Sequence, residues 1–492
     1  MKLKRSSGIL VHPTSLPGEY GIGSLGRSAY ELIDFLAASG QSFWQILPLG
    51  PTGYGDSPYQ SFSSHAGNPV LIDIPWLIER NLISSFLPPS FPEETVDYAQ
   101  VIPFKERVLR DAFQAFQAGN HSLLYQEFED FRANESHWLS DYSLFMALKK
   151  TFDLVSWTFW PDELKFRQAE AIAQYRQQLS GEILYQEFLQ FIFFKQWLEI
   201  KAYANGQGIQ IIGDIPIYVS SDSVEAWTKP EIFQVNERLE PLFVSGVPPD
   251  YFSETGQLWG NPVYNWDYLQ STQFQWWKER IEASMKLYDV IRIDHFRGFA
   301  EYWAVPAGEE TAMNGEWLDC PGKELFDELK NHFGTLPFIA EDLGLITDSV
   351  VELRERYGFP GMKILQFAFD SDEKNNYLPH TYEENFVVYT GTHDNNTVRG
   401  WFDAASSENR DALLNYIGYP AEDVSWSLMR MAHASVAALS IFPIQDVLSL
   451  GESARMNVPG TTSGNWDWRY RSEALTTALS DRLKQLTKTY DR

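Results

Sequence analysis

The sequence of 492 residues contains one cysteine, Cys320. A single thiol excludes an intramolecular disulfide framework and agrees with a reducing compartment, so we expect a cytoplasmic protein. No histidine and no sign of a helix start lies beside Cys320. We therefore interpret it as a packed thiol rather than a nucleophile.

The sequence also lacks long apolar runs and basic clusters. No uninterrupted apolar stretch is long enough to cross a bilayer, and the basic residues near Met1 are not followed by the apolar segment of a signal peptide. The formal net charge is −27, whereas nucleic-acid-binding proteins normally carry a basic patch. We therefore expect neither a membrane nor a nucleic acid as partner. The residues leave a plastid location open beside the cytoplasmic one.

Several motifs of metal and cofactor chemistry are missing. The nine histidines form no H-E-x-x-H motif, and neither G-x-x-x-x-G-K-[ST] nor G-x-S-x-G occurs. Residues 21–26 match G-x-G-x-x-G, but Pro13 and Pro17 separate them from the preceding predicted strand. The next predicted strand also lacks a terminal acidic residue to bind a ribose. We therefore expect no metal site and no cofactor.

About eight apolar runs alternate with segments of helical periodicity along the chain. This alternation is typical of a (β/α)8 TIM barrel, an α/β fold. We predict one catalytic barrel over residues 1–492 with two insertions. Residues 60–207 would form a mostly helical subdomain, and residues 216–269 an active-site loop subdomain. The predicted strands are residues 7–13, 43–49, 208–214, 289–294, 337–341, 361–369, 386–389 and 441–446.

Carboxylates stand at the ends of four of these strands: Asp214, Asp294, Glu341 and Asp394. In (β/α)8 barrels the chemistry lies at the C-terminal ends of the strands, so we expect these side chains to converge. Two carboxyl groups that flank a bond cleave glycosidic bonds, one as acid and the other as nucleophile or base. The 17 Trp and 24 Tyr fit this interpretation, because aromatic rings with polar edges stack on sugars.

Neighbouring residues indicate which carboxylate takes which role. Arg292 and Arg297 are expected to keep Asp294 ionised, as a nucleophile requires. Glu341 follows an apolar run, so desolvation is expected to raise its pKa and keep it protonated as the acid. Asp394 is a candidate for holding sugar hydroxyls and for stabilising positive charge at the anomeric carbon.

Seven blocks carry a more specific signal: residues 8–17, 53–60, 213–218, 246–262, 292–298, 340–344 and 391–396. Together they resemble the 4-α-glucanotransferases of the amylomaltase, or disproportionating enzyme, family, relatives of the α-amylase superfamily. The similarity extends over nearly the whole chain. It implies that Asp294 is the nucleophile, Glu341 the general acid/base and Asp394 the transition-state stabiliser. The implied mechanism is a retaining double displacement through a covalent glycosyl-enzyme on Asp294.

The resemblance also implies which residues bind the substrate. Arg292 and His393 would contact the sugar in the −1 subsite, and Tyr54 matches a position for a second glucan site. Asp214 either touches sugar or braces neighbouring loops. The remaining residues would lie along the donor and acceptor subsites. The full set is Tyr54, Tyr59, Asp214, Trp259, Arg292, Asp370, His393 and Asn465.

The implied activity is transfer of an α-1,4-glucan segment from a donor to the 4-hydroxyl of glucose or another α-1,4-glucan. The expected partners are α-1,4-glucans and maltooligosaccharides, and the expected assembly is a monomer or a weak homo-oligomer. Two alternatives stay open. One is an α-glucan hydrolase with the same chemistry, and the other is a non-catalytic glucan-binding protein, against which the complete carboxylate set argues.

Overall fold

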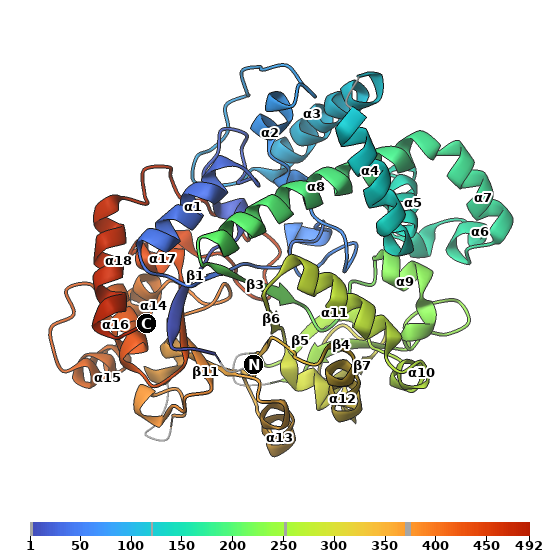
Figure 1. Ribbon diagram of the computed structural model, residues 1–492. Coiled ribbons are helices and arrows are strands. Elements are labelled where there is room, and N and C mark those ends of the chain that lie inside the picture. Colours follow the sequence, from blue (N-terminus) through green and yellow to red (C-terminus); the bar gives the residue numbers. More distant parts are fainter. Residues whose placement is uncertain (1–2, 120–121, 250–252, 370–374) are drawn as a thin grey trace.

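The computed structural model describes residues 3–119, 122–249, 253–369 and 375–492. At the centre of the molecule lies an eight-stranded sheet in which neighbouring strands are parallel (Figure 1). The strand order is β10-β11-β12-β1-β2-β3-β6-β9, and each strand overlaps one predicted strand, so the (β/α)8 barrel is confirmed. The bounds are β1 (Ser6–Leu10), β2 (Phe43–Gln45), β3 (Gln210–Ile215), β6 (Val290–Ile293), β9 (Phe338–Ala340), β10 (Gly361–Ile364), β11 (Phe386–Tyr389) and β12 (Leu439–Pro443).

The two edges of this sheet, β9 and β10, meet and close the barrel. The backbone N–H of Ala340 donates to the carbonyl of Pro360 over 2.9 Å. Beyond this bond, the Asp342 carboxylate accepts from the backbone N–H of Met362 at 2.7 Å and from Arg354 at 2.6 Å. A side chain therefore continues the pairing of the two strands at the end where the predicted site lies.

The helices that pack on the barrel bury apolar residues against it. In α1 (Arg27–Ala38), Leu32, Ile33 and Leu36 are buried at helical spacing. The helices after β3 are α9 (Val224–Thr228), α10 (Trp266–Ser271), α11 (Gln275–Leu287), α12 (Gly322–Phe333), α13 (Asp348–Tyr357), α14 (Val398–Ala404), α15 (Ser407–Ile417), α16 (Val424–Ala434), α17 (Ile444–Val447) and α18 (Thr477–Thr489). Short 3-10 helices are η1 (Pro13–Ser15), η5 (Pro230–Ile232), η6 (Phe296–Phe299), η7 (Leu365–Phe369), η8 (Pro379–Thr381) and η9 (Glu452–Ala454).

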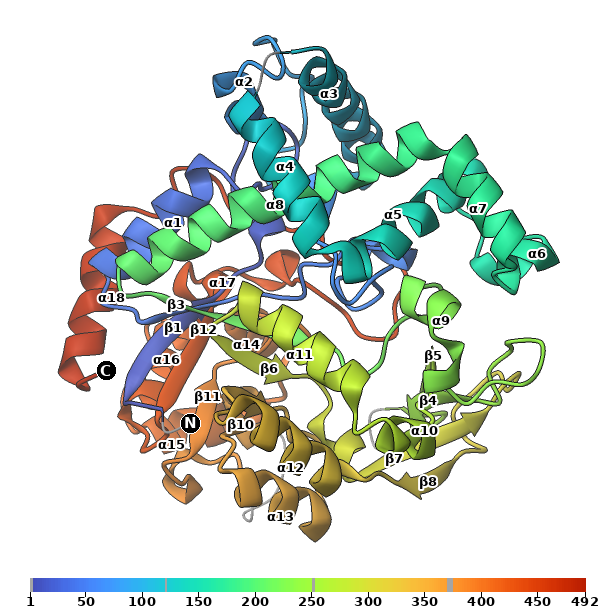
Figure 2. The same ribbon diagram turned by 45° about the vertical axis from the view of Figure 1, so that its right-hand side comes forward.

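Between β2 and β3, the described residues form helices and no extended strand. Figures 1 and 2 show α2–α7 on one side of the barrel, from which α8 returns to it. The ring of Phe116 in α3 meets Phe128 of α4 edge-on and lies tilted against Phe188 of α8, so these rings join the three helices. The division of the chain into a barrel and a subdomain of residues 60–207 stays a prediction. The elements are η2 (Tyr54–Asp56), η3 (Pro69–Leu71), α2 (Ile74–Glu79), α3 (Tyr98–Ala118), α4 (Ser122–Asn134), α5 (Ser136–Thr151), η4 (Trp157–Phe159), α6 (Asp162–Lys165), α7 (Ala169–Gln178) and α8 (Ser180–Gly206).

A second sheet of four antiparallel strands lies beside the barrel, in the order β5-β4-β7-β8 (Figure 2). Its strands are β4 (Phe243–Val247), β5 (Gln257–Pro262), β7 (Glu301–Pro306) and β8 (Glu316–Asp319). The sequence predicts only loops here. Ser245 and Gly246 within β4 are poor strand formers, and β4 pairs with β7 from a distant part of the chain. The hydrophobic periodicity of a short segment does not reveal pairing between segments that are distant in the chain.

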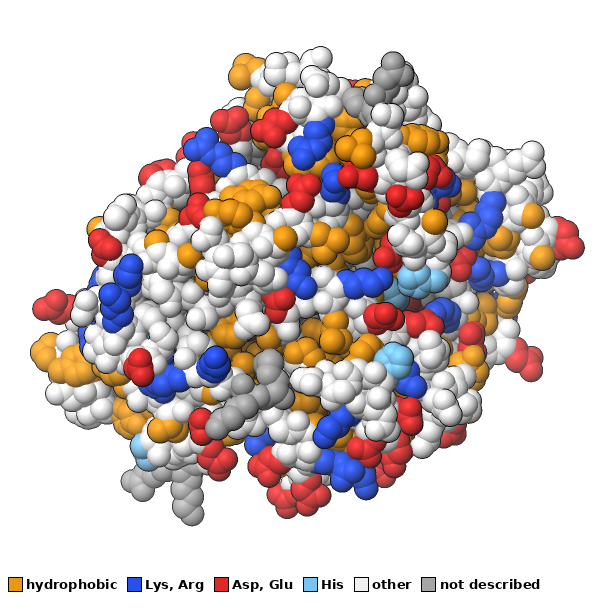
Figure 3. Space-filling model, viewed as in Figure 1, with side chains coloured by type: hydrophobic (Ala, Val, Ile, Leu, Met, Phe, Trp, Pro, Cys, Tyr) orange, Lys and Arg blue, Asp and Glu red, His pale blue; other side chains and the backbone are white. Residues whose placement is uncertain are grey.

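The surface carries both signs of charge. On the face shown in Figure 3, Lys and Arg side chains lie scattered among Asp and Glu side chains. Among the helices of the described ranges, none combines the length and the apolar character needed to span a membrane.

Candidate active site

Three neighbouring barrel strands bring three carboxylates together. Asp214 lies in β3, Asp294 directly follows β6, and Glu341 directly follows β9. In the sheet, β3 pairs with β6 and β6 pairs with β9. Because parallel strands present their C-terminal ends on the same side of a barrel, the three side chains share one end of the molecule.

Arg292 of β6 is the positive charge that these carboxylates share. Its Nη1 lies 2.5 Å from Asp214 Oδ2 and 3.1 Å from Asp294 Oδ1. Its Nη2 lies 3.4 Å from Glu341 Oε1. Burial opposes the charged form of Arg292, but the carboxylates overcome this effect and raise its pKa well above the ordinary value. One buried guanidinium therefore contacts all three carboxyl groups.

The expected contact between Arg292 and Asp294 is present, but the expectation for Arg297 is wrong. Arg297 lies in η6, where its Nη2 is 2.7 Å from Glu301 Oε1. Its Nη1 donates to the carbonyl of Leu345, and the guanidinium lies over the ring of Trp317. The chain turns after Asp294, and this turn directs Arg297 to the second sheet instead of the carboxylate cluster.

Glu341 is held as a neutral acid. Burial raises its pKa to about 8, the charges of Asp294 and Asp214 act in the same direction, and Arg292 opposes them. The backbone N–H of His295 donates to Glu341 Oε2. At neutral pH this carboxyl group therefore carries a proton that it can donate.

Asp294 is more exposed than the residues with which it forms the cluster. Its side chain is 28% exposed, compared with 3% for Arg292 and 0% for Asp214. A carboxylate that is paired on one side and accessible on the other is suited to contact a ligand.

Asp214 lies beneath the other two carboxylates. Its Oδ2 accepts from the Tyr59 hydroxyl at 2.8 Å as well as from Arg292, and its Oδ1 has no hydrogen-bond partner among the described residues. Burial raises the pKa of Asp214 to about 6. Asp214 therefore holds the side chains of Arg292 and Tyr59 in position. A contact of Asp214 with sugar stays a prediction.

A group of aromatic rings lies beside the strand ends and forms one wall of the site. The ring of Tyr59 stacks on His393 with a centroid distance of 5.1 Å, and Trp466 lies 5.9 Å from each of them. Burial raises the pKa of Tyr59 well above its ordinary value, so the hydroxyl stays protonated as a donor to Asp214. Trp466, which the sequence motifs do not single out, completes this wall.

Asp394 follows β11 and is oriented by residues from another segment. Asn457 Nδ2 donates to Asp394 Oδ1 at 2.6 Å, and Arg455 Nη2 donates to its backbone carbonyl at 2.7 Å. His393 Nε2 lies 3.4 Å from Asp394 Oδ2. The side chain of Asp394 is 45% exposed and thus open to a ligand. Sequence reasoning missed Asn457 and Arg455, since no nearby motif marks them.

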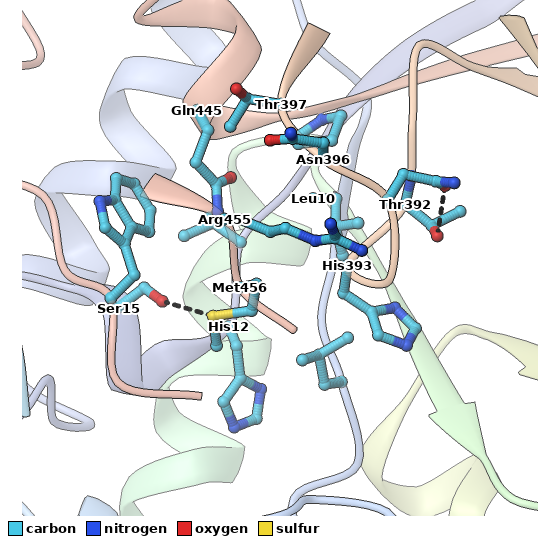
Figure 4. Close-up of a pocket in the computed structure, with 15 residues that line it drawn as sticks. Leu10, His12, Ser15, Thr392, His393, Asn396, Thr397, Gln445, Arg455 and Met456 are labelled. Carbon is cyan, nitrogen blue, oxygen red and sulfur yellow. Dashed lines mark hydrogen bonds between the residues drawn. The ribbon is translucent and has the colours of Figure 1, made fainter. Parts of the chain in front are cut away.

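A small cavity of about 30 Å³ adjoins His393 (Figure 4). Burial, together with the charge of His393, lowers the pKa of His12 to about 3, so its ring is neutral. His12 Nδ1 has no hydrogen-bond partner among the described residues. The space suits about one water molecule rather than a sugar ring. In Figure 4, one end of the cavity is formed by Asn396, Thr397 and Gln445 and the other by His12, His393 and Met456.

Trp259 of β5 contacts His295, the residue whose backbone N–H reaches Glu341. Its ring meets that of His295 edge-on, with centroids 4.7 Å apart and planes at 89°. Its Nε1 donates to Gln257 Oε1 at 3.3 Å. The second sheet therefore supplies an aromatic side chain next to the residue that hydrogen-bonds Glu341.

The other expected binding residues are placed less directly. Asn465 Oδ1 accepts from the backbone N–H of Val458 at 2.9 Å, and its Nδ2 donates to Thr461, so its amide closes its own loop. Asp370 lies outside the described residues. Tyr54 begins η2, and its side chain also lies outside what the structure describes. Sugar contacts by these three residues stay predictions.

The fold and the site together define a class of protein. The described residues include no group of three His, Cys, Asp or Glu side chains that could hold a metal ion. At the strand ends, a neutral Glu341 and a partly exposed Asp294 both contact Arg292. A (β/α)8 barrel with such a pair of carboxyl groups belongs to the enzymes that act on glycosidic bonds.

The sequence is similar over its length to one family of that class. The profile described as 4-alpha-glucanotransferase matches residues 11–476. A 4-alpha-glucanotransferase from Synechocystis sp. is 51% identical, with 99% of this chain and 98% of that protein covered. The corresponding protein from Thermus thermophilus is 47% identical, with 100% of both chains covered. The chain belongs to the 4-α-glucanotransferase family.

Solved structures agree with this assignment. The amylomaltase from Streptococcus agalactiae in complex with acarbose superposes with a TM-score of 0.96 at 46% identity, covering 99% of this chain and 100% of that one. The amylomaltase from Corynebacterium glutamicum has a TM-score of 0.77 at 19% identity, covering 98% of this chain and 75% of that one. The second comparison shows that the fold is shared.

Proposed function

We propose that this protein is a 4-α-glucanotransferase that moves an α-1,4-glucan segment from a donor to the 4-hydroxyl of glucose or another α-1,4-glucan. The observation that carries the proposal is the single guanidinium of Arg292, which contacts both Asp294 and Glu341. Family membership supports the choice of substrate. The complex of the Streptococcus agalactiae amylomaltase with acarbose supports an oligosaccharide as ligand.

In the first half-reaction, Asp294 attacks the anomeric carbon of the donor while Glu341 protonates the departing glycosidic oxygen. The bond between that carbon and the leaving glucan breaks, and a bond to Asp294 forms. The leaving glucan departs with the proton as a new 4-hydroxyl. A neutral Glu341 is the form required for this step.

In the second half-reaction, Glu341 takes the proton from the 4-hydroxyl of the acceptor, whose oxygen displaces Asp294 from the anomeric carbon. Two inversions at the same carbon retain its configuration. Negative charge moves from Asp294 to Glu341 in the first step and back in the second. Because Arg292 contacts both carboxyl groups, it stabilises the charge in either place.

The other side chains hold the reacting sugar. Asp394, oriented by Asn457, faces the positive charge that develops at the anomeric carbon. His393 and Arg292 bind hydroxyls in the −1 subsite, and the stacked ring of Tyr59 holds His393 in place. The donor and acceptor subsites are lined by Tyr59, Trp259, Asp370 and Asn465, and a second glucan site by Tyr54.

The proposed compartment is the cytoplasm, and the proposed assembly is a monomer or a weak homo-oligomer. The relatives from Arabidopsis thaliana and Solanum tuberosum are named chloroplastic/amyloplastic, so a plastid is the alternative compartment. Fractionation of the source cells tests the location.

Incubation with maltotriose tests the activity. Transfer produces a ladder of longer maltooligosaccharides together with glucose. Hydrolysis produces only shorter products, with rising reducing ends, and that result would replace the proposal by an α-glucan hydrolase. The Asp294→Asn variant is the matched control, and full turnover by this variant would exclude Asp294 as the nucleophile.

A further inference from the structure

The backbone at His295 adopts an uncommon conformation. Its φ is 49° and its ψ is 52°, in the left-handed region. Residues other than glycine rarely adopt this region, and such conformations concentrate at functional sites because the surrounding structure must maintain them. His295 lies between Asp294 and η6, so the turn occurs at the end of the strand that carries the proposed nucleophile.

The turn at His295 binds Glu341 through the backbone. The N–H of His295 donates to Glu341 Oε2. The N–H of Phe296 donates to the backbone carbonyl of Glu341 at 3.1 Å, and the N–H of Glu341 donates to Ile293 at 3.1 Å. A backbone N–H that points at a carboxyl oxygen favours the ionised form. The turn therefore supports Glu341 in the base form that follows proton donation.

The side chain of the same residue reaches the second sheet. The His295 ring makes an edge-on contact with Trp259, with centroids 4.7 Å apart. Burial, with Arg297 nearby, lowers the pKa of His295 to about 4, so the ring is neutral and its contact with Trp259 is an aromatic contact without a cation. His295 thus connects Glu341, through its backbone, with Trp259, through its ring.

The chemistry of Glu341 locates the acceptor on this side of the cleft. Glu341 protonates the leaving oxygen and later deprotonates the acceptor hydroxyl, so both oxygens occupy the space next to its carboxyl group. Trp259 contacts the ring of His295, the residue whose N–H reaches Glu341, and its ring centroid also lies 6.5 Å from that of Tyr218. The wall of Tyr59, His393 and Trp466 contacts Asp214 and Asp394 instead. An aromatic ring beside the acceptor oxygen both holds a sugar and displaces water.

We propose that His295 is a positioning residue. It holds the Trp259 ring, on which the acceptor sugar stacks, in a fixed position relative to Glu341 in its base form. This arrangement favours transfer of the glucan to a sugar over transfer to water. The proposal rests on the proposed function. His295 does not contact the reacting atoms. Its ring keeps Trp259 in place, and the left-handed turn of its backbone keeps the Glu341 carboxyl group oriented toward the acceptor hydroxyl.

The His295→Asn variant separates the two contributions. Asparagine tolerates the left-handed region and retains the backbone N–H, but it removes the ring. The rate of glycosyl-enzyme formation from α-glucosyl fluoride should stay within about 2-fold of the wild type, because the backbone bond remains. The KM for glucose as acceptor, and the ratio of hydrolysis to transfer, should both rise roughly 3- to 10-fold, the range expected for the loss of one aromatic edge contact.

His332→Asn is the matched control. His332 lies in the last turn of α12, and its ring makes a similar edge-on contact with Phe333 at 4.6 Å. Because α12 precedes β9, this contact lies at the opposite end of the barrel from Glu341. The acceptor KM and the hydrolysis ratio should therefore match those of the wild type.

A double-mutant cycle with Trp259→Ala tests whether His295 affects acceptor binding through Trp259. If His295 acts through Trp259, adding His295→Asn to Trp259→Ala should not raise the acceptor KM further. Additive effects would overturn the proposal, and so would an unchanged acceptor KM in His295→Asn. Equal losses in both half-reactions, with a lowered melting temperature, would show a structural role and also overturn it. Absence of transfer by the wild type would instead overturn the proposed function.

Discussion

The substitution Glu341→Gln separates the protonation of the site from its shape. Glutamine resembles protonated glutamate in size but does not ionise. Burial raises the pKa of Glu341 in the folded protein to about 8, compared with an ordinary value of 4.5. Between these pH values the folded protein keeps a proton that the unfolded chain releases. The free energy of unfolding of the wild type should therefore fall as the pH rises from about 5 to 8.

The size of this effect follows from the two pKa values. The interval between 4.5 and about 8 corresponds to roughly 3–5 kcal/mol, at about 1.4 kcal/mol for each pH unit. A chain of 492 residues has an unfolding entropy of about 1 kcal/mol/K near 60 °C. The melting temperature of the wild type should therefore fall by about 3–5 °C more than that of Glu341→Gln over this pH range.

Thermal unfolding at closely spaced pH values measures the difference between the two curves. Burial also raises the pKa of Asp214, to about 6, which adds a dependence of the same sign to both proteins. Glu452→Gln, at an exposed residue, is the control and should follow the wild type. Parallel curves for the wild type and Glu341→Gln would refute a neutral Glu341. The variant should also lose transfer activity by roughly 10²- to 10⁴-fold, the usual contribution of a general acid.

Three further outcomes are expected at the site. Asp294→Asn should lower kcat roughly 10⁴-fold and show no covalent sugar adduct by intact mass spectrometry with a slow fluoroglycoside, whereas an adduct on this variant would contradict its role. For the wild type, kcat/KM should fall tenfold per pH unit above a pH of about 8, because Glu341 must be protonated to donate; a profile that is flat to pH 9.5 would argue for another acid. Asn457→Ala should lower kcat roughly 10- to 100-fold, since it removes a hydrogen bond to the charged Asp394, and an unchanged kcat in steady-state assays would exclude this orienting role.

The extent to which the fold could be predicted differs between elements. The predicted strand of residues 386–389 coincides with β11, because a polar residue lies directly before and directly after this apolar run. The predicted strand 361–369 is too long, since β10 ends at Ile364 and the same apolar run continues as η7. The four-stranded antiparallel sheet was missed because its partners are far apart in the chain.

The contacts of the carboxylate cluster could also be predicted only in part from the sequence. Arg292 and Arg297 are both close to Asp294 in sequence, and the sequence predicts that both keep Asp294 ionised. Only Arg292 contacts Asp294, because alternate residues of a strand point to the same side, whereas the turn at His295 redirects the chain before Arg297. Local sequence does not specify that turn.

The sequence predicts the alternation of strands and helices, the carboxylates at the strand ends and the family motifs, because these depend on periodicity and on residue type. It does not reveal that one guanidinium contacts three carboxyl groups, or that Asn457 orients Asp394. Each of these depends on burial or on contacts between segments distant in the chain. Such properties arise only when the barrel closes and removes water from the charged groups.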